Sequence, residues 1–395
     1  PATASGQGHA DAMSLTALVG AAIVQPHGIA QDHALLMEGA HIVDVVPKNR
    51  LPSGCAHIML EGGWLLPGFI DTQVNGGGDV LLNDRPDVEG MRAIAQAHRR
   101  FGTTGMMPTL ISDVADKVNA AIVAGEAAMA QSVPGILGVH VEGPHLNPGK
   151  KGIHDAAKFA PIDATVLARL TQPTRGRRIV TLAPELAPPG AIRALAQADV
   201  IVAAGHSLAD YDQTVMALNE GLAGFTHLFN AMTQMGSREP GMVAAALLDR
   251  TSHFGLIVDG LHVHPAALRV ALAARGIDGA MLVTDAMPPV GGSNARFSLM
   301  GQDIHVVDGT CRGLDGTLAG SALNMAQAFR NAMDMLGCSM MDASRMASGN
   351  PAKFLRLEQE TGAILPGLRA DLVHLDVQRR VRRSWIAGDI SEQGE

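Results

Sequence analysis

The sequence predicts an α/β protein, a (β/α)8 TIM-like barrel with a small β-sandwich domain that is built from both chain ends. Short apolar runs alternate with helical patterning through the middle of the chain, whereas both ends show only short strand-like segments between turn residues. The 395 residues suit one barrel-sized domain and one smaller domain, and the 47% hydrophobic content allows a large core.

The two chain ends read as strands of one small domain. We expect residues 13–66 and 362–395 to form this domain and residues 67–361 to form the barrel. Residues 1–12 are small and polar, and we expect them to be a leader that is disordered or foreign to the native chain. The expected strands of the small domain are 17–24, 34–38, 41–47, 56–61, 371–376 and 381–387.

Eight apolar runs recur in the middle of the chain, each followed by a helical pattern. Continuous Val, Ile, Leu and Ala runs between helices are typical of parallel strands buried on both faces, and eight such units over about 280 residues fit a barrel. An open doubly wound sheet is the alternative, but no GxGxxG motif follows a first strand to support a dinucleotide site. The runs are 68–75, 104–110, 136–142, 179–185, 200–207, 224–230, 254–259 and 281–285, and the helical candidates include 88–101, 114–131, 208–219 and 265–274.

The net charge and the cysteine content indicate which binding partners and which cellular compartment to expect. The net charge is −8 and no Lys/Arg-rich stripe runs along the chain, which argues against nucleic acid and anionic membranes as partners. The three cysteines are widely spaced without a CxxC motif, so we expect neither disulfides nor a cysteine zinc site. The apolar run 15–24 lacks a basic leader and is too short to span a bilayer, and we therefore expect a cytoplasmic protein.

Polar side chains end nearly every apolar run. In a barrel the carboxyl ends of all strands meet on one face, and active sites lie there. The clearest examples are His140, Glu142, Glu185, His206, His227, Asp259 and Asp285.

Three of these residues form a candidate metal site. Glu142 alone would more often be a capping or salt-bridge residue, and His206 or His227 alone would more often be a core histidine. Together, at the ends of strands three, five and six, they would converge on one mouth. Two histidines, one glutamate and an open position make a usual catalytic zinc set.

Further polar residues are candidates for functional or structural roles, and both interpretations are open for Asp285 and Arg238. Asp285 could act as a general base on a metal-bound water or could simply cap a loop. Arg238 could grip a phosphate or could pair with its neighbour Glu239. His262 follows the seventh run, and we expect it to contact substrate rather than metal. We expect residues 143–152 to form a mobile loop that carries His154 over the barrel mouth. Ser207 is expected to cap the next helix.

An ordered set of motifs in this chain resembles the N-acetylglucosamine-6-phosphate deacetylase family of the amidohydrolase superfamily. Each motif alone is weak, but the set runs in order through most of the chain. The motifs are PGFID at 67–71, HVEGP at 140–144, KGIH at 151–154, LAPE at 182–185, AGHS at 204–207, THLFNAM at 226–232, REPG at 238–241, DGLH at 259–262, VTDA at 283–286 and LAGS at 318–321.

The resemblance implies a role for each matching residue. Glu142, His206 and His227 would bind the metal, Asp285 would be the catalytic acid and base, and His154 would help to polarise the acetyl carbonyl. The family is typically homodimeric, with part of the phosphate site crossing the subunit interface. The substrate contacts implied for this chain are Asn230, Ala231, Arg238, His262, Gln73, His154, Leu318 and Ala319.

One position departs from the superfamily pattern. Many amidohydrolases place His-x-His at the end of strand one and bind two metals, whereas this chain has Gln73-Val74-Asn75. Because an amide is a poor zinc ligand compared with imidazole, we expect one divalent ion per subunit, Zn²⁺, with any second site weak or absent.

The implied activity is hydrolysis of N-acetyl-D-glucosamine 6-phosphate to D-glucosamine 6-phosphate and acetate, in amino-sugar catabolism or cell-wall recycling. The galacto epimer is an alternative substrate, as are N-acyl amino acids and cyclic amides, although Arg238 favours a phosphorylated molecule. A barrel that has lost its chemistry and serves as a scaffold is the non-enzyme alternative. The presence of Glu142, His206, His227 and Asp285 argues against it.

Overall fold

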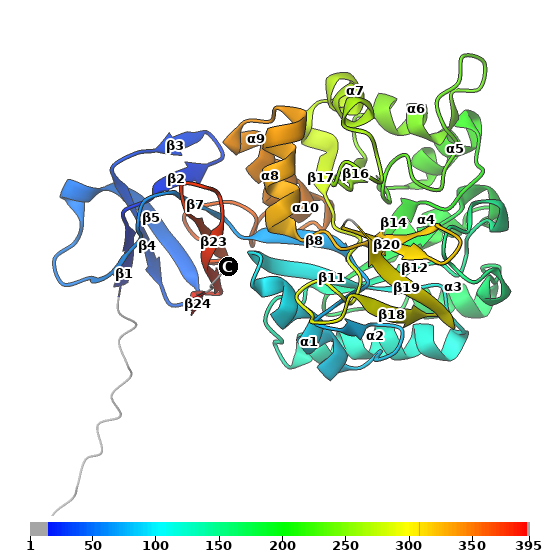
Figure 1. The fold of residues 1–395 in the computed structure, drawn as a ribbon, viewed down its shortest axis with the longest axis horizontal. Helices are drawn as coiled ribbons and strands as arrows, with labels where there is room; N and C mark the ends of the chain where they lie inside the picture. The colour runs from blue at the N-terminus through cyan, green and yellow to red at the C-terminus, as the bar shows by residue number, and fades with distance from the viewer. Residues whose placement is uncertain (1–14, 308, 393–395) are drawn as a thin grey trace, which may run out of the picture.

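The computed structural model describes residues 15–307 and 309–392, and the predicted leader 1–12 lies outside the described residues. A parallel eight-stranded sheet closes into a barrel with helices around it, and a smaller group of strands lies at one side (Figure 1). The predicted barrel with small sheets from both chain ends is thereby confirmed. The exact domain boundaries, 13–66 with 362–395 and 67–361, stay a prediction.

Each barrel strand overlaps one predicted apolar run. The strands pair in sequence order, and an isolated parallel bridge between Val74 and Ala286 joins the last to the first. The Asp285 N–H donates to the Gln73 carbonyl at 3.0 Å across the same seam. The strands are β8 (Phe69–Val74), β11 (Thr103–Ile111), β12 (Gly138–Glu142), β13 (Arg177–Leu182), β14 (Ile201–Ala204), β15 (Gly224–Phe225), β16 (His253–Leu256) and β17 (Ala280–Leu282).

Helices follow the strands and cover the barrel (Figure 1). The four helical candidates correspond to α1, α2, α5 and α7. The prediction that Ser207 caps α5 is wrong, because Asp210 caps it in a reciprocal box with Gln213, and the Ser207 hydroxyl donates to Glu185 at 2.6 Å instead. The helices are α1 (Val88–Arg99), α2 (Ala115–Ala130), α3 (Ala164–Leu170), α4 (Ala191–Gln197), α5 (Tyr211–Glu220), α6 (Gly241–Leu248), α7 (Pro265–Arg275), α8 (Met325–Leu336), α9 (Met340–Ser344) and α10 (Asn350–Phe354).

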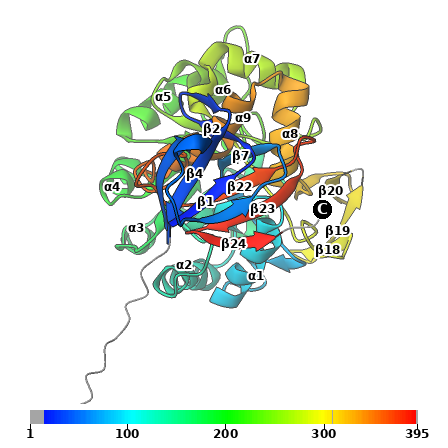
Figure 2. The same ribbon diagram turned by 90° about the vertical axis from the view of Figure 1, so that its left-hand side faces the viewer.

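Strands from both chain ends lie together in the small domain (Figure 2). One sheet has the order β5-β4-β1-β6 and the other the order β24-β23-β22-β7-β2-β3. The strands are β1 (Leu15–Val19), β2 (Ala22–Gln25), β3 (Gly28–Ala30), β4 (His33–Glu38), β5 (His41–Pro47), β6 (Ala56–Met59), β7 (Trp64–Pro67), β22 (Leu372–Leu375), β23 (Val381–Ile386) and β24 (Asp389–Glu392).

The single strand predicted at 17–24 is two strands in different sheets. Gly20 separates β1 from β2 with a φ of 113°, and a Cβ atom there would lie 2.2 Å from the carbonyl oxygen of Leu60. Only glycine can therefore make this corner, and the chain crosses from one sheet to the other at this point. The apolar run continued through the corner, so hydrophobic patterning could not reveal it.

Residues between β17 and α8 form an antiparallel sheet that the sequence analysis did not predict. Its strands cover one side of the barrel mouth, and their apolar side packs on Ile111 and Met287 through Ile304 and Cys311. Residues 318–321, which carry the LAGS motif, form its last strand. The strands are β18 (Arg296–Leu299), β19 (Gln302–Val307), β20 (Thr310–Gly313) and β21 (Leu318–Ser321). A separate short hairpin of β9 (Gly76–Gly77) and β10 (Val80–Leu81) directly follows β8 in the chain.

We expect Trp385→Ala to destabilise the protein by about 3 to 5 kcal/mol, because Trp385 is fully buried between the two small sheets beside Leu35 and Leu372. Equilibrium urea unfolding followed by circular dichroism measures the change. Val377→Ala, at a side chain that is 67% exposed, is the control and should shift stability by less than about 0.5 kcal/mol. Equal effects of the two substitutions would contradict this account of the small core.

No helix among residues 15–307 and 309–392 has the length and apolar character needed to cross a membrane.

Candidate metal centre and active-site cavity

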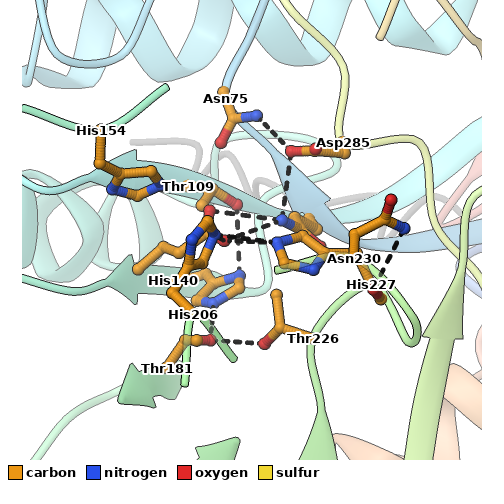
Figure 3. Close-up of polar contacts among 12 residues, drawn as sticks. Asn75, Thr109, His140, His154, Thr181, His206, Thr226, His227, Asn230 and Asp285 are labelled. Atoms are coloured by element: carbon orange, nitrogen blue, oxygen red, sulfur yellow. Dashed lines mark hydrogen bonds and ion pairs between the residues drawn. The ribbon is translucent and has the colours of Figure 1, made fainter. Parts of the chain in front are cut away.

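Glu142, His206 and His227 meet at the carboxyl end of the barrel. Glu142 ends β12, and the two histidines follow β14 and β15. The Nε2 atoms of His206 and His227 lie 3.3 Å and 3.1 Å from Glu142 Oε1. The two Nε2 atoms lie 3.1 Å from each other (Figure 3). All three side chains are buried, and the structure therefore gathers the predicted ligand set at one point.

Unusual backbone conformations aim these side chains. His206 and His227 have φ values of 51° and 34°, and Asp285 has 52°. Non-glycine residues rarely adopt this left-handed region, and when they do they are often at functional sites. Each of the three follows the end of a barrel strand, so the sharp turn directs its side chain into the mouth. Hydrophobic periodicity carries no sign of this conformation.

The donor atoms fit a divalent transition metal. His206 Nδ1 donates to the Lys150 carbonyl at 2.8 Å, which leaves the Nε2 lone pair free to bind a metal. One carboxylate oxygen and two imidazole nitrogens, all buried and open to a cavity on one side, make the set typical of catalytic zinc.

The surroundings of Glu142 and Asp285 shift the pKa values of the two carboxyl groups in opposite directions. Burial raises the pKa of Glu142, but the hydrogen bonds from His206 and His227 outweigh burial and hold it well below its usual range. Burial, together with the nearby charge of Glu142, raises the pKa of Asp285. Pairs of carboxyl groups whose pKa values are pushed apart are typical of sites where one is a permanent anion and the other exchanges protons.

Gln73 and Asn75 hold the carboxylates in place. The Gln73 amide donates to both oxygens of Glu142 at 3.2 Å and 3.3 Å and to Asp285 Oδ1 at 3.1 Å. The Asn75 amide donates to the same Asp285 oxygen at 2.7 Å (Figure 3). Gln73 was expected to contact substrate, yet it lies behind the carboxylates and does not line the cavity. Both amides therefore orient acidic groups.

His154 faces the cluster from the loop after β12. The Ser112 hydroxyl and backbone N–H approach His154 Nδ1 at 2.8 Å and 3.3 Å. Because Nδ1 accepts these bonds, the ring proton belongs on Nε2, where it can be donated to a ligand. Burial, reinforced by His206, lowers the pKa of His154 to about 3, so the ring is neutral. Sequence reasoning missed Ser112, although it directly follows the second barrel strand.

A cavity of about 250 Å³ opens beside the cluster. His154, Asp285 and the three candidate ligands line it together with four of the expected substrate contacts. Two other expected contacts do not line it: Ala319 is fully buried within β21, and Arg238 is exposed on the surface. His154 is itself an expected contact, so five expected contacts line the cavity, and the other four are Asn230, Ala231, His262 and Leu318.

One ring nitrogen of His262 is hydrogen-bonded to Asp259, and the other has no partner among the described residues. Its Nδ1 lies 2.6 Å from Asp259 Oδ2, while Asp259 Oδ1 accepts the backbone N–H of His262 at 2.9 Å. His262 Nε2 is buried and has no partner among the described residues. The nitrogen is therefore available to a molecule in the cavity.

Two of the polar strand-end residues do not belong to the site. His140 bonds the Thr72 carbonyl at 3.0 Å and the Thr181 hydroxyl at 2.8 Å, and it is absent from the cavity lining. Glu185 accepts the Ser207 hydroxyl and the Asn147 amide, which anchors loops beneath the mouth. Both are structural residues that the strand-end pattern alone could not distinguish.

Asp71 ends the PGFID motif, to which the sequence analysis assigned no role, and it connects β8 to the segment that carries Asp285. The Thr284 hydroxyl donates to Asp71 Oδ2 at 2.5 Å, and the Gln73 N–H donates to Oδ1 at 3.2 Å. Burial raises the pKa of Asp71 to about 7 despite the opposing effect of the Thr284 hydroxyl. Asp71 thus fixes the spacing between Gln73 and Asp285.

The barrel, the buried Glu–His–His set and the adjacent Asp285 define the chain as a barrel protein with a candidate hydrolytic metal centre. The Amidohydrolase family model matches residues 64–391. The chain belongs to the amidohydrolase family.

Several known proteins are similar to this chain over most of its length. It is 42% identical to the N-acetylgalactosamine-6-phosphate deacetylase of Shewanella sp. (strain ANA-3), over 86% of each chain. It is 38% identical to the N-acetylglucosamine-6-phosphate deacetylase of Bos taurus, over 85% of each chain. The crystal structure of N-acetylglucosamine-6-phosphate deacetylase from Pasteurella multocida superposes with a TM-score of 0.93 at 30% identity, covering 96% of this chain and all of that one.

Proposed function

We propose that this protein hydrolyses the acetamide of an N-acetylhexosamine 6-phosphate, releasing acetate and the free amino sugar. The observation that carries the proposal is the convergence of Glu142, His206 and His227 beside Asp285 in one cavity. The similar deacetylases named above supply the substrate class. We place the reaction in the cytoplasm, in amino-sugar catabolism or cell-wall recycling.

Glu142, His206 and His227 would hold one divalent ion, and we propose zinc. The bound ion would supply a Lewis acid that makes water nucleophilic near neutral pH. Gln73 and Asn75 present amide N–H groups to Asp285 and no imidazole, so they favour a single ion over a pair.

Asp285 moves the proton in this mechanism. Its Oδ1 accepts both amides, whereas its Oδ2 has no hydrogen bond from the described residues and is free to take a proton from water. The water oxygen bonds to the acetyl carbon, His154 Nε2–H donates to the acetyl oxygen, and the C–N bond breaks as Asp285 returns the proton to nitrogen. Acetate and the amine leave.

The phosphate would bind away from the reacting bond and position the acetyl group. His262 offers its unpartnered Nε2 from the cavity wall, and Asn230 and the Ala231 backbone lie on the same cavity. Arg238 lies outside this cavity. We propose that it reaches the phosphate of a second subunit in a homodimer, as the family resemblance implies.

Two epimers are candidates for the sugar. The gluco substrate is the one that the sequence motifs imply, and the galacto substrate is favoured by the 42% identity to a deacetylase of that name. We expect acetate release from both 6-phosphates, with at least a tenfold preference in kcat/KM for one, and little turnover of the unphosphorylated sugars. Parallel assays of the four compounds by acetate release test this. Absence of acetate from both phosphates would overturn the proposed function.

A further inference from the structure

An unpartnered oxygen lies beside the proposed acid. Asn75 is 1% exposed and lines the cavity, and its Oδ1 has no hydrogen-bond partner among the described residues. A buried carbonyl oxygen without a hydrogen-bond donor destabilises the folded protein, and most such groups in folded proteins find a partner. This oxygen therefore calls for a donor that comes from the cavity.

The orientation of the Asn75 amide is fixed. Its backbone N–H and that of Gly76 both donate to the Ala286 carbonyl at 2.9 Å, next to Asp285. Its Nδ2 donates to Asp285 Oδ1 at 2.7 Å. Turning the amide over would set its oxygen against a carboxylate oxygen, which is unfavourable. Figure 3 shows the nitrogen toward Asp285 and the oxygen on the side of His154.

The chemistry of amide hydrolysis needs an acceptor at this place. When water adds to the acetyl carbon, the nitrogen becomes pyramidal and carries a lone pair, which Asp285 must protonate before the C–N bond breaks. The lone pair faces Asp285 only if the N–H points elsewhere. An oxygen tied to Asp285 itself is well placed to accept that N–H.

We propose that Asn75 is a catalytic residue that accepts the acetamide N–H through Oδ1 while its Nδ2 holds Asp285. The Asn75 side chain would thereby hold Asp285 and the acetamide nitrogen that Asp285 protonates in a fixed position relative to each other. The inference rests on the proposed deacetylase function, and it assigns Asn75 a substrate contact that the sequence analysis did not.

The test compares the amide substrate with an ester analogue, in which oxygen replaces nitrogen at C2 of the hexose 6-phosphate. The ester has no N–H to donate. Asn75→Ala removes both hydrogen bonds of the side chain, so any displacement of Asp285 slows both compounds. Only the amide also loses its acceptor. We expect the ratio of kcat/KM for amide over ester to fall by about 10- to 100-fold.

Two further variants separate the two hydrogen bonds. Gln73→Leu removes the N–H donors to Asp285 and to Glu142 at a residue that does not line the cavity, so it should slow both compounds equally and leave the ratio unchanged. Asn75→Asp keeps an acceptor but loses the donor, and it should also keep the ratio near that of the wild type. Metal content and melting temperature are measured for each variant, and rates are normalised to metal-loaded protein.

The outcomes separate the inference from the proposed function. A wild-type protein that does not hydrolyse the amide contradicts the function itself. A wild type that does, with an amide-to-ester ratio unchanged in Asn75→Ala, overturns only the role of Asn75. A fall of the ratio in Gln73→Leu equal to that in Asn75→Ala would do the same, because it would trace the effect to Asp285.

Discussion

Asp285→Asn should retain the bound metal and lose turnover by about 10³- to 10⁴-fold, the upper range for a general acid and base. The amides of Gln73 and Asn75 both donate toward Oδ1, so the new side chain should place its oxygen there. Its NH₂ group then occupies the Oδ2 position, where it can neither take a proton from water nor protonate the leaving nitrogen. Steady-state acetate release and metal analysis measure both effects.

A matched substitution controls for the loss of one carboxylate elsewhere. Asp163→Asn changes an exposed cap of α3, and asparagine caps helices as well as aspartate does. It should keep the wild-type rate. If Asp285→Asn kept more than a tenth of the activity, the proton-transfer role would be wrong, and if it lost the metal, Asp285 would belong to the ligands.

His206→Ala should lose the metal itself, and turnover with it. The substitution removes one of three donors and opens the side of the cluster where Nε2 lies 3.3 Å from Glu142. Replacing a residue that only supports a ligand costs 10- to 100-fold in metal affinity, so loss of a ligand should cost more than about 100-fold. Atomic emission spectroscopy after gel filtration should give close to one ion per wild-type chain and almost none in the variant.

His145 offers a control of similar burial. It lies three residues after Glu142, and its Nδ1 donates to the Ala160 carbonyl at 2.8 Å, away from the cluster. His145→Asn can keep that bond and should keep the metal. Full metal occupancy in His206→Ala would show that the ion binds elsewhere, and the proposed reaction would lose its electrophile.

Local hydrophobic patterning was enough to predict the barrel strands of this protein and the helices between them. Each barrel strand is a short apolar run between helical segments, and burial on both faces forces that composition whatever the surroundings. The helix α7 begins at Pro265, where the sequence places it, because proline suits the first helical position. Glu142, His206, His227 and Asp285 were predicted because they are polar residues at the ends of apolar runs.

Pattern was insufficient where a distant group decides the outcome. Gly20 turns the chain between two sheets because the Leu60 carbonyl leaves no room for a side chain. The β18–β21 sheet, which the sequence analysis did not predict, is held by packing of its apolar side on Ile111 and Met287. Neither contact can be inferred from the residues that lie next to it in the sequence.

By itself, the sequence determined the order of the eight barrel strands and the set of polar residues that end the apolar runs, because both follow from local periodicity and chain connectivity. Only the tertiary structure decided which of those residues share a site. His140 lies inside β12 and Glu185 lies beyond the end of β13, and both bond to neighbouring strands and loops instead of the cavity. The direction of a side chain depends on backbone angles such as the positive φ of His206 and His227, and on partners that lie far away in the chain.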